Sequence, residues 1–393
     1  MATPQSEASK IPQPQKLSPF SIYEKLDESE TWWLDHSEWL EEKGYMLRPR
    51  FRPGWVPSWV TGNNPVPWEV EDQRYFGHPE TMDATRISDN AMVMMKRMNY
   101  SLESEIATYF STEPLASHPR NYCVPVYEVL QVPDPTGDDD EIIIVMPFLR
   151  HFWNPRFKSV GEAVEFFRQI FEGLQFIHEH NISHRWVFIF LTSCVKLTYD
   201  HARDVSSLNI MMDPRPTFPE MFHPTVVSRS RDFKSFAKFH TRTSRPTKYL
   251  FIDFGNSEKF EPGQERKVYP LRGGDKTVPE FRHGGDIDPF PADVYCIGNL
   301  IRRKFLEPAK GVEFIQPLID DMVQTDPTKR PTMDEVVLRY DEMVKSLSYW
   351  HLRSMLLERH EDTLGIIIIA IAHIYRTIIH IFTFRSPIPR PPQ

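Results

Sequence analysis

The hydrophobic pattern of the chain changes at Ser159, and this change limits the available folds more than any other feature. Before Ser159, apolar residues gather in short runs such as 92–98 and 141–148, which are typical of strands. After it, they recur at helical spacing over 163–177, and Ser159 with Glu162 forms the capping-box pattern of a helix start. Strands followed by helices predict an α+β fold with a β-rich part and a larger helical part.

The composition narrows the class of protein. The chain has 393 residues, of which 40% are hydrophobic and 25% charged, as in ordinary globular proteins. A formal net charge of −8 gives no global basic field, so we expect no nucleic-acid partner. The cysteines lie far apart without CxxC spacing, which argues against a disulfide framework or zinc site and predicts a reducing, cytoplasmic, intracellular location. They are Cys123, Cys194 and Cys296.

The N-terminal segments carry weaker signals. Residues 1–20 are polar and contain proline but no apolar core of a signal peptide, so we expect a disordered tail. Residues 21–82 are expected to form an extension, helical over 22–42 and then packed but irregular over 47–68, where prolines forbid a regular helix. We prefer this packed segment to a proline-motif ligand. The apolar face of the predicted helix carries Trp33, Leu34, Trp39 and Leu40.

Several polar motifs contain the kinds of group that phosphoryl transfer requires. This chemistry needs a cation for the phosphates, metal ligands, and a carboxylate to position the hydroxyl nucleophile. Lys96 lies inside an apolar run, His-Arg occurs at 184–185, Arg-Asp-Val-Ser-Ser-Leu-Asn at 203–209, and Asp-Phe-Gly follows an apolar strand at 253–255. Each motif alone is a weak signal, whereas their order and spacing are specific.

Over residues 83–347 these motifs resemble the eukaryotic protein kinase superfamily. Thr-Val-Pro-Glu at 277–280, Asp293 in DVYCIG and the block at 318–336, with DPTKRP, complete the resemblance. It implies a bilobal protein-kinase-like fold with a small β-rich N-lobe at 83–146 and a larger helical C-lobe at 150–347.

Three further features are similar to the divergent kinase-like family expanded in fungi. They are Pro-Ser-Trp at 57–59, Val-Met-Pro-Phe-Leu at 145–149, and the long segment that follows Asn209. This narrower resemblance implies a fungal origin for the chain.

The resemblance assigns roles in the N-lobe and the hinge. Lys96 would bind the α- and β-phosphates of ATP. Glu105 on the next helix would be its ion-pair partner, with Glu103 as the competing candidate; we prefer Glu105 because a core-facing isoleucine follows it. Met146 would be the gatekeeper, and the backbone around Phe148 would line the adenine pocket.

The resemblance also assigns the catalytic and metal-binding residues. Asp204 would orient the substrate hydroxyl, and Asn209 and Asp253 would bind Mg²⁺. Arg330 would pair with Glu280 as a buried structural ion pair. The implied function is ATP- and Mg²⁺-dependent transfer of the γ-phosphate to a serine or threonine of a protein substrate.

Departures from the family pattern support an alternative function. No GxGxxG precedes Lys96, since residues 54–90 contain three widely spaced glycines, and Ser206 stands where serine/threonine kinases usually have lysine. Other kinases also lack this lysine; the absent Gly-rich loop and the interruption of the catalytic motif favour a pseudokinase that acts as a binding or scaffolding module. A third alternative, a small-molecule phosphotransferase, is weakened by the Pro-Glu and DPTKRP features, which build a platform for protein substrates.

Residues 186–202 interrupt the catalytic motif. Removing 186–203 joins His184-Arg185 to Asp204 and restores HRDVSSLN, and these 18 residues correspond to 54 nucleotides, which keeps the reading frame. The segment contains neither Gly nor Pro, although inserted loops normally carry turn residues. We therefore hypothesise a retained short intron that is translated.

A basic run at 228–245 has two interpretations. It would be either a solvated loop, which we prefer, or a site for a phosphorylated or acidic partner.

The C-terminal tail, residues 348–393, contains an apolar helix at 364–384 that is long enough to span a membrane. Arg376 lies near its middle and opposes insertion, and together with His373 and His380 it gives one face a polar stripe. We therefore expect a helix that is docked on the protein or makes peripheral contact with a membrane surface, rather than a span.

Overall fold

The computed structural model describes residues 25–61, 70–73, 78–133, 140–185, 209–270, 277–282, 284–359 and 362–392. The chain divides into two compact units, residues 1–75 and 76–393, and each is described by itself. The predicted tail at 1–20, the insertion at 186–202 and the candidate catalytic residue Asp204 lie outside the described residues.

The first unit contains short helices where one long helix was predicted. The predicted helix at 22–42 is wrong in this respect, because it breaks at His36, whose ring stacks on Trp32 with 3.9 Å between centroids. Trp33 and Leu40 are fully buried, as the apolar pattern predicts. The elements are α1 (Glu28–Asp35), α2 (Ser37–Glu42), β1 (Tyr45–Leu47), η2 (Pro49–Phe51), α3 (Ser58–Thr61) and η4 (Glu71–Gln73).

Polar contacts hold the proline-rich segment of this unit together. The buried Arg50 pairs with the buried Glu30, with 2.6 Å between Nε and Oε1. The carboxylate of Asp72 accepts hydrogen bonds from the indole of Trp55 and the backbone N–H of Ser58. The segment is thus packed and irregular, and its longest regular piece among the described residues is the four-residue α3.

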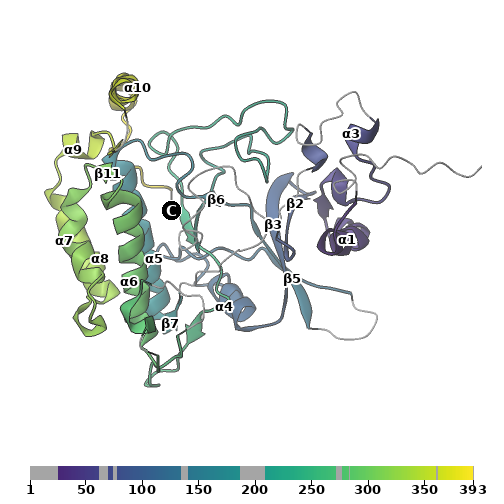
Figure 1. Ribbon diagram of the computed structural model, residues 1–393, viewed down its shortest axis with the longest axis horizontal. Helices are drawn as coiled ribbons and strands as arrows, with labels where there is room; N and C mark the ends of the chain where they lie inside the picture. Colours follow the sequence, from purple (N-terminus) through teal and green to yellow (C-terminus); the bar gives the residue numbers. More distant parts are fainter. Residues whose placement is uncertain are drawn as a thin grey trace, which may run out of the picture. The chain divides into compact units, whose positions relative to one another are not determined.

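The second unit begins with an antiparallel sheet. Within this unit the strand order is β2-β3-β5-β4, and a helix occupies the connection from β3 to β4 (Figure 1). That helix, α4, is Leu102–Phe110. The strands are β2 (Thr81–Arg86), β3 (Ala91–Asn99), β4 (Glu128–Gln131) and β5 (Glu141–Pro147).

The run at 124–130 is a strand only in its second part, β4, which begins at Glu128. The first part of that run turns away from the sheet, because the N–H of Val124 donates to the carbonyl of Phe251 at 2.8 Å. The N–H of Phe251 in turn donates to the carbonyl of Tyr122. Pro125 then interrupts the ladder, since it has no N–H to donate.

Helices dominate the rest of the second unit. Helices α5, α6, α7 and α8 lie together, away from β2, β3 and β5 (Figure 1). α5 packs against α8 and α9, and α6 packs against α7. The helices are α5 (Val160–Glu179), η6 (Pro279–Arg282), α6 (Pro289–Ile301), η7 (Arg302–Leu306), η8 (Glu313–Ile315), α7 (Gln316–Met322), η9 (Pro327–Lys329), α8 (Met333–Ser346), α9 (Tyr349–Arg353) and α10 (Thr363–Phe382).

Short strands connect these helices. β8 pairs antiparallel with β6 and β9, β10 pairs with β7, and β11 pairs with β12. Their bounds are β6 (Arg150–His151), β7 (Ile182–Ser183), β8 (Ile210–Met212), β9 (Tyr249–Phe251), β10 (Glu258–Lys259), β11 (Ala309–Lys310) and β12 (Leu357–Glu358). The protein is therefore mixed α+β, with the antiparallel sheet before the helices in sequence.

Half of the predicted capping box is present at the start of α5. The Ser159 side chain accepts from the N–H of Glu162 at 3.3 Å. The Glu162 carboxylate does not return to Ser159; it accepts from the N–H of Lys158 at 2.7 Å and from Thr243. Tertiary contacts thus take the carboxylate that a local pattern assigns to the cap.

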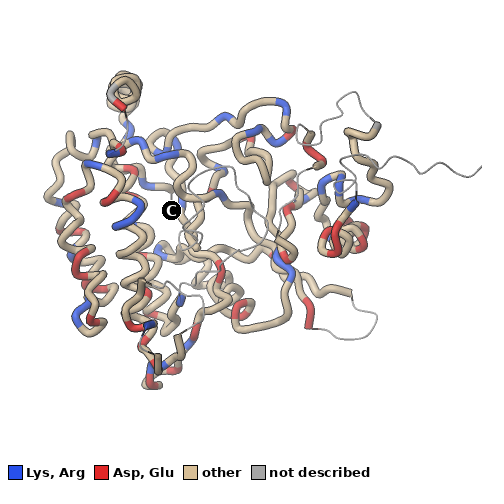
Figure 2. The backbone as a smooth tube through the Cα atoms, viewed as in Figure 1, with Lys and Arg blue, Asp and Glu red and all other residues tan. Residues whose placement is uncertain are grey.

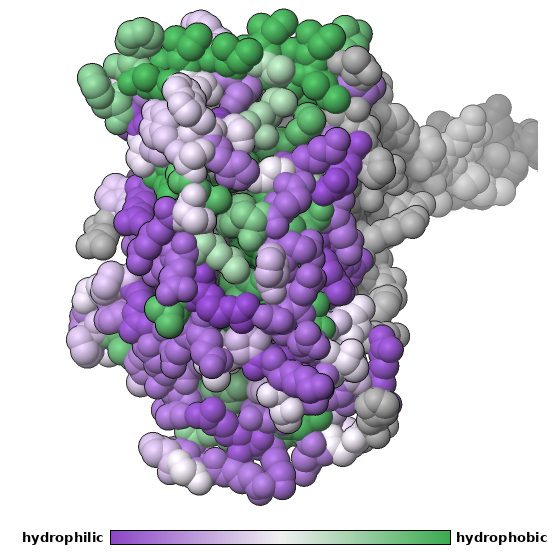
Figure 3. Space-filling model, turned by 90° about the vertical axis from the view of Figure 1, so that its left-hand side faces the viewer, coloured by the Kyte–Doolittle hydropathy of each residue, from purple (hydrophilic) through white to green (hydrophobic). Residues whose placement is uncertain are grey.

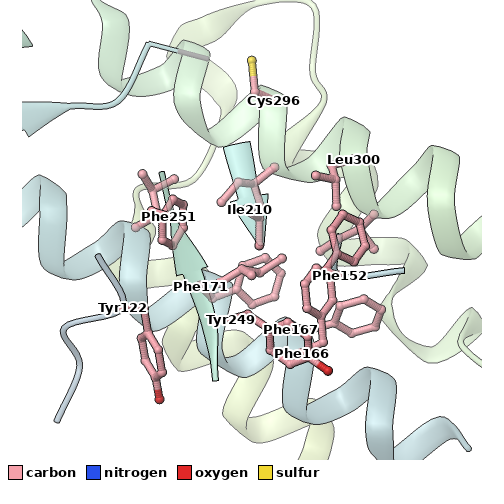
Figure 4. Packing of buried hydrophobic residues seen from close by; sticks show 14 of the residues in the cluster. Tyr122, Phe152, Phe166, Phe167, Phe171, Ile210, Tyr249, Phe251, Cys296 and Leu300 are labelled. Atoms are coloured by element: carbon pink, nitrogen blue, oxygen red, sulfur yellow. The ribbon is translucent and has the colours of Figure 1, made fainter. Parts of the chain in front are cut away.

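An aromatic core surrounds α5. Phe166 and Phe167 of α5 pack against Phe305, and Phe166 stacks on Phe152 with 4.7 Å between centroids (Figure 4). Tyr249 of β9 meets Phe166 edge-on from the strand side. These buried rings join strand β9 to the helices.

The basic run at 228–245 is only partly solvated. Arg242 is buried, donates to the carbonyl of Phe152 at 2.6 Å and lies over the ring of Phe157. Arg231 donates to the Thr85 hydroxyl on β2 at 2.6 Å. The prediction of a solvated loop is therefore wrong for these two arginines, which tie the run to the folded unit.

Candidate functional site

Lys96 of β3 lies between two carboxylates that come from distant parts of the chain. Its Nζ is 2.5 Å from Oε1 of Glu103 on α4 and 3.4 Å from Oδ1 of Asp253 after β9. Pairing of β3 with β2 and β5 places Lys96 mid-strand, opposite Thr81 and Ile144. Glu103 lies seven residues from Lys96 in sequence, whereas Asp253 is 157 residues away and is brought to Lys96 by the fold. We call this group the Lys96 cluster (Lys96, Glu103 and Asp253).

Electrostatics keep Lys96 protonated. Burial lowers the pKa of its ammonium, but attraction by Glu103 and Asp253 outweighs the burial, so the pKa of Lys96 is raised above its ordinary value. About a fifth of the lysine side chain and a quarter of the Asp253 side chain remain exposed, at 21% and 26%. The cluster thus presents a charged cation beside a partly open carboxylate.

The predicted ion-pair partner Glu105 is wrong, because Glu103 holds that position. In α4, Glu103 shares a face with the buried Ile106, Ala107 and Phe110, which lie at i+3, i+4 and i+7. Glu105 lies on the opposite, exposed face. The i+3, i+4 and i+7 spacing of apolar residues after Glu103 is the signal in the sequence that identifies the correct carboxylate.

Asp253 follows β9 in a left-handed backbone conformation, with φ at 63°. Such a conformation is uncommon for residues other than glycine and is often found at functional sites. Phe254 next to it is buried and packs against Phe110 of α4 and His184, with centroids 6.0 and 5.1 Å apart. The core therefore holds the Asp-Phe-Gly turn in place.

Gly255 lets the two carboxylates of the Lys96 cluster approach each other. A Cβ at this position would lie 3.0 Å from Oε2 of Glu103 and 3.3 Å from Oδ1 of Asp253. Any side chain here would push one of the carboxylates away from Lys96.

Asn209 lies beside Asp253 through the pairing of β8 with β9. The carbonyl of Asn209 accepts from the N–H of Ile252 at 3.0 Å, one residue before Asp253. Asn209 is 7% exposed. The two residues predicted to bind a metal are thus neighbours across adjacent strand ends.

The backbone of the His-Arg pair at 184–185 is held by the side chain of Asp293 in α6. This fully buried carboxylate accepts the backbone N–H of His184 at 2.7 Å and that of Arg185 at 2.8 Å. The His178 ring lies 3.1 Å away from the same carboxylate, a partner that the sequence did not reveal. The His184 ring reaches the carbonyl of Ile252 at 3.1 Å, next to Asp253.

Met146 and Phe148 differ in what they offer a ligand. Met146, at the end of β5, is half-buried and faces Met94 of β3 across the ladder. Phe148 is buried, its ring packs against Phe222, and its N–H donates to the carbonyl of Met92 at 3.3 Å. The Phe148 amide is thus already engaged within the protein, and the expected lining of an adenine pocket by the backbone around Phe148 stays a prediction.

The predicted ion pair between Glu280 and Arg330 is confirmed. Both Nη atoms of Arg330 donate to the two carboxylate oxygens of Glu280, at 2.7 Å each. The arginine side chain is fully buried and also donates to the carbonyls of Pro291 and Gln324. The pair joins η6 to the loop that precedes α8.

The donor set around Asp253 is small. Among the described residues, no three or more His, Cys, Asp or Glu side chains are grouped so that they could hold a metal ion. Mg²⁺ in phosphoryl-transfer sites needs only one or two protein carboxylates, because substrate phosphates and water complete its shell. One carboxylate from Asp253 and an amide oxygen from Asn209 fit that requirement.

No model of a known protein family matches the chain. The chain matches no curated protein sequence either. We therefore infer a function from the chemistry of the residues around Lys96.

Proposed function

We propose that the chain is a protein kinase that transfers the γ-phosphate of ATP to a serine or threonine hydroxyl. The carrying observation is the Lys96 cluster, in which a lysine of β3 contacts a helix carboxylate and the aspartate of an Asp-Phe-Gly turn. Phosphoryl transfer requires a cation close to a metal-binding carboxylate, since the phosphates contact both the cation and the metal ion that the carboxylate holds.

The arrangement of elements supports a bilobal kinase-like fold. The sheet β2-β3-β5-β4 with α4 between β3 and β4 would be the N-lobe, and the helices from α5 onward the C-lobe. Residues 147–149 would be the hinge, since they begin at the last residue of β5. The Lys96 cluster draws one carboxylate from each side of this hinge.

The residues present fit ATP and Mg²⁺. Lys96 would bind the α- and β-phosphates, and Asp253 with Asn209 would hold Mg²⁺, which when bound neutralises charge on the phosphates. Asp204 would orient the substrate hydroxyl. The backbone of Arg185, held by Asp293, and that of Asn209, held by Ile252, fix the described ends of the segment that contains Asp204.

The buried Glu280–Arg330 pair favours a protein substrate over a small molecule. It fixes η6, at the end of the segment that follows Asp253, against the helical part of the unit. Such a fixed surface would suit an extended polypeptide better than an enclosed small molecule.

A pseudokinase remains the second candidate, and the glycine content favours it. Residues 54–90 contain glycine at three positions, so they lack the closely spaced glycines whose N–H groups cradle phosphates. Such a chain would bind nucleotide or a partner through the same fold without transferring phosphate.

The test combines binding and transfer on one sample. We expect MgATP to raise the melting temperature of the protein and radiolabelled ATP to label it or a generic protein substrate. Lys96→Met should abolish labelling without unfolding the protein, whereas Arg97→Met, a matched change on the opposite face of β3, should retain it.

Each outcome has a distinct meaning. Binding without transfer would support the pseudokinase, and neither binding nor transfer would overturn both candidates. Full activity in Lys96→Met would remove the Lys96 cluster from the mechanism.

A further inference from the structure

The C-terminal helix α10 has its apolar face on the outside. Its exposed positions recur at helical spacing and are apolar throughout, and the polar stripe predicted from the sequence faces inward. Figure 3 shows this face as a hydrophobic band along the upper edge of the molecule, and Figure 2 shows few charged residues on α10. The most exposed members are Leu364, Ile368, Ile371, Ile374, Tyr375 and Phe382, at 59–78% exposure.

Contacts with the folded unit fix this orientation. The ring of His373 lies 2.9 Å from the carbonyl of Arg353 in α9. Arg353 also donates to the carbonyl of Arg385, just after α10. At the start of α5, a Cβ on Gly161 would overlap the carbonyl of Pro387, so the segment after α10 packs tightly there. The apolar face is therefore presented outward by a docked helix.

A small cationic cavity lies beneath the helix. Its volume is about 20 Å³, enough for one or two water-sized groups. Lys158, Arg353 and Arg376 line it together with Glu162, whose carboxylate already accepts from Thr243 and the Lys158 N–H. Burial, and then the nearby charge of Arg376, lowers the pKa of Lys158. Three cationic side chains therefore line the cavity, and the carboxylate of Glu162 among them already accepts other hydrogen bonds.

We propose that α10 docks the protein on an anionic lipid surface. Its outer isoleucines would enter the acyl boundary, and phosphate oxygens of lipid headgroups would contact cations at the edge of the helix, namely the partly exposed Arg376 and the exposed Arg385 and Arg390. A helix in the membrane interface buries its apolar face by about 5–10 Å, so its polar face lies at headgroup depth. The proposal does not depend on kinase activity.

Charge and composition favour lipid over a protein partner. The outer face is almost entirely aliphatic, whereas protein interfaces are enriched in Tyr, Trp and Arg at their centres. The cations Arg385 and Arg390 follow the helix and are exposed. Exposed Tyr349 and Trp350 lie on the adjoining α9, and such aromatic residues are typical of membrane interfaces.

The position of Arg376 in the apolar helix favours surface docking over a transmembrane span. Among the described residues, Leu364–Phe382 is the one helix long and apolar enough to span a bilayer, with a mean hydropathy of 1.9, and such a helix alone is weak evidence for a span. An arginine such as Arg376 at the centre of a span opposes insertion into the bilayer. At the interface the same arginine meets phosphate, so surface docking uses the charge that a span opposes.

The test is flotation of the full-length protein with vesicles of phosphatidylcholine, alone or with about 30 mol% phosphatidylserine. We expect binding to the anionic vesicles. The double substitution Ile371→Glu with Ile378→Glu should weaken this binding about tenfold or more. Leu338→Glu on α8 is the matched control, since Leu338 is 63% exposed and Ile371 64%; it should bind as the parent does.

Arg376→Gln tests the cationic side. It should weaken binding to anionic vesicles about fivefold and leave binding to neutral vesicles unchanged, because one basic residue near a charged surface contributes about that factor. Lys329→Gln, an exposed lysine before α8, is the charge-matched control and should have no effect.

Four results would overturn the proposal. The first is equal binding by the parent and the Ile371→Glu, Ile378→Glu variant. The second is retention in the pellet after carbonate extraction, which would indicate a span. The third is a parent protein that does not bind vesicles and is a dimer, while the variant is a monomer; this would indicate that a second copy of the chain covers this face. The fourth is abolition of vesicle binding by millimolar inorganic phosphate, which would indicate a free-anion site.

Discussion

At the scale of single residues, the ion pair between Lys96 and Glu103 can be tested by changing one carboxylate at a time. Glu103→Gln should cost about 1.5–3 kcal/mol of stability, because a largely buried charged hydrogen bond is lost. It should also weaken MgATP binding, since Lys96 loses the group that orients it. Glu105→Gln is the matched control two residues away. Urea unfolding and a nucleotide thermal shift measure both effects, and equal effects of the two variants would contradict the assignment.

His184 gives a pH dependence whose sign follows from its surroundings. Burial lowers the pKa of its imidazole below the ordinary value near 6.5, although Asp293 and Asp253 oppose this. The unfolded chain therefore binds a proton at a higher pH than the folded protein. The free energy of unfolding should accordingly fall as the pH drops from about 6.5 towards the pKa of His184 in the folded protein. Above about pH 6.5 this contribution should stay constant.

His184→Gln isolates this contribution. Burial also lowers the pKa of His373 and His380, and both remain in the variant, so part of the slope persists. Denaturant unfolding at about pH 7.5 and about pH 5.5 should show a smaller loss of stability in His184→Gln than in the parent. An unchanged loss would show that His184 does not titrate in this range.

At the scale of elements, local sequence patterns predict a helix or strand correctly where contacts within that element determine its structure. β3, α4, β5 and the start of α5 lie where the apolar spacing places them. The errors arise where a distant partner competes. Val124 bonds to Phe251 instead of extending β4, and Glu162 bonds to Thr243 instead of closing the capping box.

The same limit applies to the candidate site. The motifs predict which residues lie near Lys96, since Asp253 and Asn209 follow strands that the sequence reveals. The choice between Glu103 and Glu105 depends on which face of α4 is buried, and three apolar residues indicate that face. The support of His184 and Arg185 by Asp293 cannot be seen from spacing, because it joins positions about a hundred residues apart through backbone N–H groups.

The pair between Glu280 and Arg330 sets the attachment of η6. Glu280→Ala leaves a fully buried guanidinium without its carboxylate, which costs about 3–5 kcal/mol. We expect a marked fall in melting temperature. Glu307→Ala, at an exposed carboxylate 3.9 Å from Arg302, is the control and should change stability by less than about 1 kcal/mol. A Glu280→Ala variant that melts like the parent would show that the pair is dispensable.

At the scale of the whole molecule, the two ends of the interrupted catalytic motif meet at one residue. The His184 ring lies 3.1 Å from the carbonyl of Ile252, and the N–H of Ile252 donates to the carbonyl of Asn209 at 3.0 Å. His184 and Asn209 are therefore close in space, although 24 residues lie between them in sequence. A much shorter connection would suffice to join them.

Deleting residues 186–203 supplies that shorter connection. It leaves Asp204–Leu208 between Arg185 and Asn209, and five residues reach about 16–18 Å when extended, ample for two ends held at the same residue. Loop closure becomes less costly as the loop shortens, by roughly 0.6 kcal/mol for each halving of its length. We therefore expect the deletion to raise both the melting temperature and the rate of phosphotransfer, because Asp204 then lies a fixed, short distance from Arg185. Deleting the five residues 186–190 alone is the control, since it shortens the loop without restoring HRDVSSLN, and it should not raise the rate.

Sequencing of the transcript tests the origin of the segment independently. If every mature message retains the 54 nucleotides and the full deletion lowers stability, the segment is an integral part of the fold and the retained-intron hypothesis is wrong.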